Sequence, residues 1–307
     1  MTTPDGTFPD DSPVFPFLTS IAGSLLTVAP EKGDDLKKQL CDLAVRLVID
    51  QDVERLFRAV VRDGRRNICC SIFGAEALWA SAYAYWVVYS KLKTARGTEL
   101  LFSEHDDTKI LPELLDFAFS DRLGRRDTRP WPSHLPGPVG HMDGEVETDV
   151  NAATELWLCA LAWILHHELA HLRLGHVAKR EQELSDEIEA DEGATDWLLG
   201  GVTDQAVLLK RSLGIATATV WISGLVLQRE HRSSMRNRTH PHASERILRA
   251  LSHSALAEVN QAQEFAFVAL KVHLDHWRVS VPPVAYDDGR DALHAYCKAL
   301  TDWELNR

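Results

Sequence analysis

The chain has 307 residues, of which 45% are hydrophobic and 25% are charged, so it can bury one large core or two modest ones. Its formal charge is −12, and its pI is near 5.6. Because nucleic acids and anionic membranes are bound through basic surfaces, this charge argues against both as partners. The five cysteines lack C-x-x-C spacing, which is typical of free thiols in a reducing compartment. We therefore expect a cytoplasmic protein.

The N-terminal part of the chain is predicted to be helical behind a disordered tail. Residues 1–16 are rich in Pro, Asp, Thr and Ser and have neither the basic nor the apolar region of a signal peptide. Helical periodicity then runs, with breaks, from Leu18 to Val61. A basic turn follows at residues 62–66, and residues 67–73 are predicted to form a strand.

Two further helices are expected before the middle of the chain. Residues 74–92 are rich in Ala, Trp and Tyr. Glu76 interrupts this stretch, which also falls short of the roughly 20 residues of a membrane span, so a buried core helix is favoured. Residues 111–120 show a second helical pattern. No integral membrane segment is therefore expected here.

Residues 122–149 are predicted to form a long irregular loop. Prolines at four positions alternate with glycines at four others. Loops of this length in compact domains are usually either functional or disordered. Two alternatives stay open: a rim or lid over a cleft, or a plain surface loop. The histidines in this loop, His134 and His141, are expected to be solvated surface residues.

The next stretch, Trp157 to His176, reads WLCALAWILHHELAHLRLGH and is predicted to form an apolar helix. His167 and His171 are separated by about 40° around a helix axis, so both imidazoles project from one face. Glu168 lies about 100° further round, within reach of a water on the same ion. A catalytic zinc site requires two imidazoles, one ligand from elsewhere in the chain and a carboxylate base beside the open position.

Residues 180–200, REQELSDEIEADEGATDWLLG, form a second helical pattern that is dense in carboxylates. Glu189, Glu192 and Asp196 fall on its polar face and are explained by solvation. Glu187 and Asp191 instead fall on the apolar stripe that Leu184, Ala194 and Leu198 form. Because buried carboxylates need a cation or hydrogen-bond donors, Glu187 is predicted as the third zinc ligand and Asp191 as the acceptor that orients a ligand histidine.

The C-terminal part is predicted to be helical. Residues 212–227 are apolar but too few to span a bilayer comfortably, so we expect a core helix packed on the zinc helix. Helical patterns continue through residues 243–277, with a break, and 291–303. Together the patterns indicate a mostly α protein (α+β) with a small β-sheet.

Three blocks carry a resemblance to a known family. His167-Glu168-x-x-His171, then Glu187-x-x-Ala-Asp191, then the stretch from His240 to Ile247 that contains Pro241 and Arg246, are similar to the motifs of gluzincin metallopeptidases. The group that includes the CAAX prenyl proteases and the HtpX-type proteases carries this set. The chain's length, Gly175-His176 and the Asp-Trp-Leu-Leu ending of the acidic helix also resemble the Lit-type phage-exclusion peptidases.

The resemblance implies a zincin-like core and a zinc-dependent endopeptidase that cleaves an intracellular protein or peptide. In that reading Zn²⁺ is bound by His167, His171 and Glu187, and Glu168 is the general base. Gluzincins add a downstream donor to the oxyanion, and by resemblance His240 or Arg246 could serve. His166 and His176 point about 100° and 180° away from His167 on a continuous helix and are not predicted as ligands.

One alternative function is a catalytically silent zinc-binding regulatory or interaction protein. The base Glu168 argues against it, because a closed structural site has no use for a base. Resemblance to phage-exclusion peptidases further implies a latent phage-defence protease with an activating protein or peptide. In this view the loop of residues 122–149 covers the cleft at rest.

These expectations give a provisional division of the chain. It has a tail at residues 1–16, an N-terminal helical region at residues 17–121 packed on the catalytic part, the loop at residues 122–149, and a metallopeptidase region at residues 150–307. The strand that holds substrate is expected either at residues 67–73 or within the loop.

Overall fold

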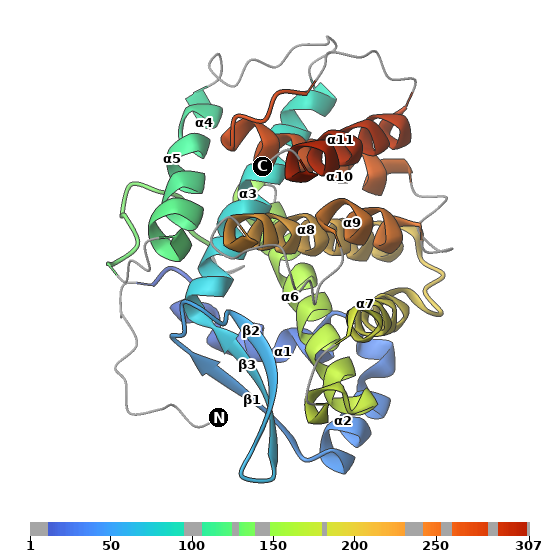
Figure 1. Ribbon diagram of the computed structural model, residues 1–307. Coiled ribbons are helices and arrows are strands. Elements are labelled where there is room, and N and C mark those ends of the chain that lie inside the picture. Colours follow the sequence, from blue (N-terminus) through green and yellow to red (C-terminus); the bar gives the residue numbers. More distant parts are fainter. Residues whose placement is uncertain are drawn as a thin grey trace.

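The computed structural model describes residues 12–94, 106–124, 129–138, 148–179, 183–230, 242–252, 260–281 and 288–305. It is mostly helical with one three-stranded sheet, as the sequence predicts (Figure 1). The elements are η1 (Phe15–Phe17), α1 (Leu18–Thr27), η2 (Pro30–Lys32), α2 (Gly33–Asp42), β1 (Val45–Asp50), β2 (Phe57–Arg62), β3 (Arg65–Ser71), α3 (Ile72–Thr94), α4 (Asp106–Lys109), α5 (Leu111–Leu115), η3 (Asp116–Gly124), α6 (Asp149–Leu174), η5 (His176–Ala178), α7 (Leu184–Leu199), α8 (Gln205–Glu230), α9 (Ala243–Leu251), α10 (Asn260–His276) and α11 (Gly289–Leu305).

The sheet has the strand order β1-β3-β2, with β1 parallel and β2 antiparallel to β3. Asp63 and Gly64 turn β2 into β3, and both have the positive φ that such a tight hairpin turn requires. The predicted helix is therefore wrong from Val45 to Val61, where two strands form instead. Short apolar runs do not distinguish a strand from a helix, and pairing with β3 decides the outcome here.

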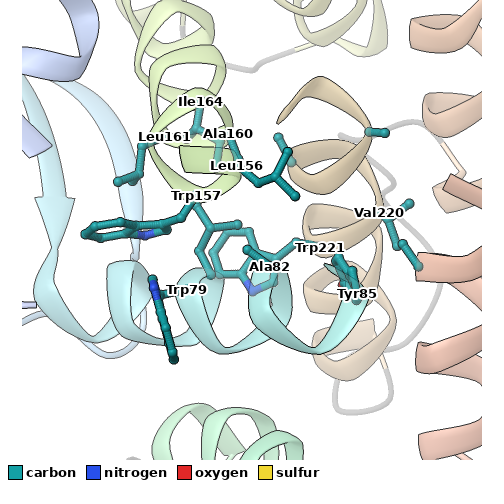
Figure 2. Packing of buried hydrophobic residues seen from close by; sticks show 14 of the residues in the cluster. Trp79, Ala82, Tyr85, Leu156, Trp157, Ala160, Leu161, Ile164, Val220 and Trp221 are labelled. Carbon is teal, nitrogen blue, oxygen red and sulfur yellow. The ribbon is translucent and has the colours of Figure 1, made fainter. Parts of the chain in front are cut away.

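The core is built where α3, α6 and α8 meet (Figure 1). Figure 2 shows Trp79 of α3, Trp157 of α6 and Trp221 of α8 packed among smaller apolar side chains. The Trp79 indole donates to Thr154 Oγ1 at 3.2 Å, and the Trp157 indole donates to the Ala75 carbonyl at 3.0 Å. These bonds satisfy the indole N–H groups that burial removes from water.

Helix α8 packs against α6 at very close range. A Cβ atom on Gly214 of α8 would collide with Cys159 of α6, so only glycine allows this approach. The predicted core helix on the zinc helix is thereby confirmed. Helices α9 and α10 pack on α8, and α11 packs on α10 (Figure 1). In the part of the chain that the structure describes, every helix is too short or too polar to cross a bilayer.

The predicted tail is wrong for residues 12–16. Val14 is completely buried, and the Ser12 hydroxyl donates to Glu76 Oε1 at 2.6 Å. Glu76 lies on α3 and is itself buried, so the chain before α1 supplies a donor to a core carboxylate. This pairing joins residues far apart in the sequence, and a compositional prediction does not detect it.

The described part of the long loop, residues 129–138, is anchored to the core. Trp131 is buried and lies edge-on to Trp79 and Phe117. Trp79 in turn bonds Thr154 in the second turn of α6. Thirteen residues at about 1.5 Å each separate Thr154 from His167, so this anchor lies about 20 Å along α6 from the predicted zinc ligands. His134 is exposed, as predicted, and pairs with Glu113; His141 lies outside the described residues.

Candidate metal centre

Helix α6 carries the two predicted ligand histidines. Its N-cap, Thr148, accepts a hydrogen bond from the Asn151 N–H at 3.2 Å, and its C-cap is Gly175, whose φ of 77° is left-handed. His167 and His171 lie one turn apart and are 5% and 3% exposed. Their Nε2 atoms are 3.0 Å apart. The helical spacing therefore brings two imidazole nitrogens to one point, as the sequence predicts.

Helix α7 supplies the carboxylates. It begins with a capping box in which Glu183 and Asp186 exchange bonds with each other's backbone N–H groups. Glu187 and Asp191 are 4% and 5% exposed, so the predicted burial of both is confirmed. Leu184, which was placed on the same stripe, is instead exposed, because it is the first residue of the helix, where position around the axis does not decide burial.

Three side chains converge as the ligands of one ion would. His167 Nε2 lies 3.7 Å from Glu187 Oε2, and His171 Nε2 lies 3.4 Å from Glu187 Oε1. Ligand atoms held at about 2.0–2.2 Å around a tetrahedral zinc are themselves about 3.3 Å apart. The ligand atoms of all three residues lie within 4.8 Å of one another. Two imidazoles and one carboxylate form a donor set that suits zinc and leaves a fourth position for water.

Asp191 and Arg246 form a buried charge cluster that contacts His167 and Glu187. Asp191 Oδ1 is 2.8 Å from His167 Nδ1 and accepts a 2.6 Å hydrogen bond from Arg246. The same guanidinium donates to Glu187 Oε2 at 3.4 Å. Burial by itself would raise the pKa of Asp191, but the Arg246 charge and His167 lower it below its usual value. Asp191 is therefore an anion in contact with His167, and the Arg246 guanidinium faces two buried carboxylates.

Glu168 occupies a more open position than the ligands. It is half-buried, whereas the three ligand side chains are buried. Its carboxylate interacts electrostatically with His171 of α6, Arg246 of α9 and Cys69 of β3. A carboxylate at the rim of a buried donor set can take up a proton from a water beside the ion.

The two neighbouring histidines have different positions. His166 is a structural residue, as its predicted direction implies: its Nε2 lies 3.1 Å from the Leu25 carbonyl, and burial lowers its pKa to about 3. His176, however, does not continue the helix. Because α6 ends at Leu174, His176 turns back and its Nδ1 lies 3.1 Å from His171 Nδ1. The glycine at position 175 was the signal that could have revealed this turn.

The remaining predicted positions are placed as follows. His240 lies outside the described residues, whereas Arg246 lies on α9 against Asp191 and Glu187. Residues 67–73 are not a substrate edge, because β3 is the central strand and both of its sides are paired. The outer strand nearest the site is β2, which packs beside α6 and η5.

Comparison with known proteins identifies the family of the chain. Residues 69–266 match the family Peptidase U49, a range that contains all the predicted ligands. The chain is 34% identical over 250 residues to a protein of Escherichia coli (strain K12) named cell death peptidase, covering 78% of this chain and 82% of that protein. No solved structure matches the chain. The predicted peptidase character is confirmed, and the chain belongs to the Peptidase U49 family.

Proposed function

We propose that this protease is a zinc-dependent endopeptidase. The observation that carries the proposal is the convergence of His167, His171 and Glu187, whose ligand atoms lie within 4.8 Å of one another. All three side chains are buried, and a buried carboxylate facing two imidazoles needs a compensating cation or hydrogen-bond donors. Arg246 supplies one positive charge beside three carboxylates, those of Glu187, Asp191 and Glu168, so a divalent ion would bring the sum of the formal charges to zero.

The proposed chemistry assigns a role to each described residue. When bound, zinc would lower the pKa of a water toward 7 and polarise the scissile carbonyl. Glu168 takes the proton of that water and passes it to the leaving amine. Asp191 holds His167 through Nδ1, so that Nε2 is free for the metal. The half-buried position of Glu168 supports its role as base, because the base must reach substrate.

The tetrahedral oxyanion needs a hydrogen-bond donor besides the metal. His240 and Arg246 are both proposed by resemblance. The Arg246 Nη2 donates to Asp191 and Glu187, and these bonds support a role in holding the ligand helix. The oxyanion role is therefore better assigned to His240.

Substrate is proposed to dock as an extended peptide on β2. This strand lies at one edge of the sheet, next to α6 and to the η5 turn that follows the zinc ligands. An outer strand offers backbone N–H and C=O groups to an incoming chain, and pockets beside it read alternate side chains. A protein or peptide substrate with an extended segment fits this edge strand.

A catalytically silent zinc protein is the second candidate. Its support is that a tight donor set alone could serve a structural role. Three ligands and an adjacent Glu168 favour catalysis instead, because structural zinc sites are closed by four protein ligands. The name of the bacterial relative, cell death peptidase, supports a proteolytic activity that is harmful when released. A latent defence protease, silent until an activating protein or peptide appears, is the setting we propose.

The test is a comparison of cellular proteomes with wild-type and Glu168→Gln protein, each produced with and without phage infection. New protein termini should appear with the wild type and be at least about a hundredfold rarer with the variant, which keeps the shape but removes the proton acceptor. Equal cleavage by both proteins would overturn the mechanism. Zinc bound by both, with no cleavage by either under all conditions, would favour the silent zinc protein.

A further inference from the structure

We infer that His176 is a positioning residue for the metal: it accepts the Nδ1–H of His171 and thereby holds this ligand with Nε2 free. The inference rests on the proposed zinc site. His176 lies outside the three-residue donor set, and its position follows from the turn after α6.

The chain reaches this position because α6 ends at Leu174, two residues before His176. Gly175 has a φ of 77°, and its N–H bonds the His171 carbonyl, which closes the helix. The following 3-10 turn carries His176 back under the last helical turn, where it is 2% exposed. Its ring meets the His171 ring edge-on, at 5.2 Å between centroids and 70° between planes. Without the left-handed glycine, the side chain would continue along the helix and point away from the ligands.

The contacts determine the tautomers of both rings. His171 Nε2 faces His167 Nε2 and Glu187, so it is the ligand atom and carries no proton. Its Nδ1 must then carry the proton, and the nearest acceptor is His176 Nδ1 at 3.1 Å. A His176 that accepts at Nδ1 has its own proton at Nε2.

Two carboxylates face that second proton. His176 Nε2 lies 3.3 Å from Glu189 Oε2 and 3.5 Å from Asp186 Oδ1. Glu189 is largely exposed, with 57% of its side chain accessible, whereas Asp186 is buried. Its helical position predicted that Glu189 faces solvent. In the structure its side chain is largely exposed, but its carboxylate also contacts His176 in the turn that follows α6. Glu189 and Asp186 both favour the Nε2–H form of His176.

Asp186 connects this turn to the ligand-bearing start of α7. Its Oδ2 accepts from the Glu183 N–H at 3.0 Å, and its Oδ1 forms an ion pair with Lys179. Glu187 is the next residue. The connection from His171 through His176 to Asp186 therefore joins the end of α6 to the first turn of α7, and it fixes two ligands relative to each other. His167 is oriented by a carboxylate, Asp191, whereas His171 is oriented by a neutral ring.

Three variants test the acceptor role. His176→Phe keeps a ring but has no acceptor, His176→Asn places a carbonyl oxygen near the position of Nδ1, and His176→Gln places it near Nε2. Competition against a zinc chelator should show about 10–100-fold weaker zinc binding for the Phe and Gln variants. The Asn variant should stay within about threefold of wild type, because its oxygen accepts from His171. Thermal unfolding of the zinc-free proteins establishes that each variant folds.

The outcomes separate this inference from the proposed function. Wild-type affinity in the folded Phe variant, or equal losses in the Phe and Asn variants, would overturn the role of His176 while the zinc site stands. Failure of the wild-type protein to bind zinc would overturn both. If the Phe variant does not fold, nitrogen-15 NMR of histidine-labelled, zinc-loaded wild type decides: His176 should show a proton on Nε2, and a proton on Nδ1 would contradict the inference.

Discussion

Arg246 on α9 donates a 2.6 Å hydrogen bond to Asp191 on α7, a residue 55 positions earlier in the chain. Asp191 Oδ1 is also 2.8 Å from Nδ1 of the predicted ligand His167 on α6. Three helices from separate parts of the sequence therefore meet at one buried carboxylate. Because two adjacent buried carboxylates without a cation would be unstable, this ion pair stabilises the arrangement of the proposed metal ligands.

Replacing Arg246 with Met should lower the unfolding free energy of the zinc-free protein by about 3–5 kcal/mol, because Asp191 and Glu187 lose their only described guanidinium. Urea denaturation in the presence of a chelator measures this. Arg246→Lys keeps the positive charge but lacks the planar guanidinium. Its unfolding free energy should lie between those of the wild type and the Met variant. If stability is unchanged and only the cleavage rate drops, Arg246 acts on the oxyanion instead.

The second prediction concerns the zinc content of variants at the proposed metal ligands. Purified protein should contain about one zinc per chain, which His171→Ala and Glu187→Ala should lose and Glu168→Gln should retain, because a base does not ligate. Metal analysis by mass spectrometry checks the stoichiometry. Glu192→Ala is the matched control: Glu192 lies on the same helix with 59% of its side chain exposed, and its loss should leave zinc unchanged. Zinc depletion in this control alone would show that the wrong helix face was assigned.

Trp131 tests the proposal that the long loop is a lid. Its indole is buried against Trp79 and Phe117, so Trp131→Ala should cost about 3–5 kcal/mol of stability. Basal proteolysis per folded molecule should not rise, because this anchor lies far along α6 from the ligands. A fluorogenic or cellular cleavage assay, corrected for the folded fraction, measures it. A clear rise in basal cleavage would contradict this expectation and would show that residues 129–138 belong to the lid.

Gly214 should not tolerate a side chain. A Cβ there would collide with Cys159, so Gly214→Ala should destabilise the protein by about 1–3 kcal/mol through separation of α8 from α6. Gly33→Ala is the control, since Gly33 has helical φ and ψ and open space around its Cβ position. That change should be neutral or stabilising by up to about 1 kcal/mol. Differential scanning calorimetry compares the two, and equal melting temperatures would contradict the packing described.

His273 should contribute a pH dependence to stability. Burial, and to a lesser extent His276, lower its pKa to about 3, whereas the unfolded value is 6.5. The unfolded chain therefore binds more protons between these pH values. Stability from this residue is complete above pH 6.5 and is lost as pH falls toward 3, by up to about 1.36 kcal/mol per pH unit. His273→Gln, which keeps an acceptor for the Tyr85 hydroxyl, should reduce the measured slope by that amount; an identical slope would show that His273 titrates normally.

The sequence by itself determined the features that depend on local geometry. The four-residue spacing of His167 and His171 and of Glu187 and Asp191 places each pair on one helix face whatever the rest of the chain does, because helical geometry repeats every 3.6 residues. The same rule predicted burial of both carboxylates, whereas the apolar character of residues 212–227 predicted the core helix there. The run of helical patterns along the chain was sufficient for the mostly helical class.

Tertiary structure alone decided the rest. Strands β1 and β2 were misread as helix because a short apolar run has no preferred state until it pairs with a neighbour. Ser12 is buried where its hydroxyl bonds Glu76 of α3, and the charge balance of the site depends on Arg246. His176 turns toward His171 because Gly175 adopts a left-handed conformation, which the helical extrapolation ignored. These features depend on contacts between residues far apart in the sequence, or on the backbone torsion of one residue. Neither kind of cause produces a periodic pattern in the sequence.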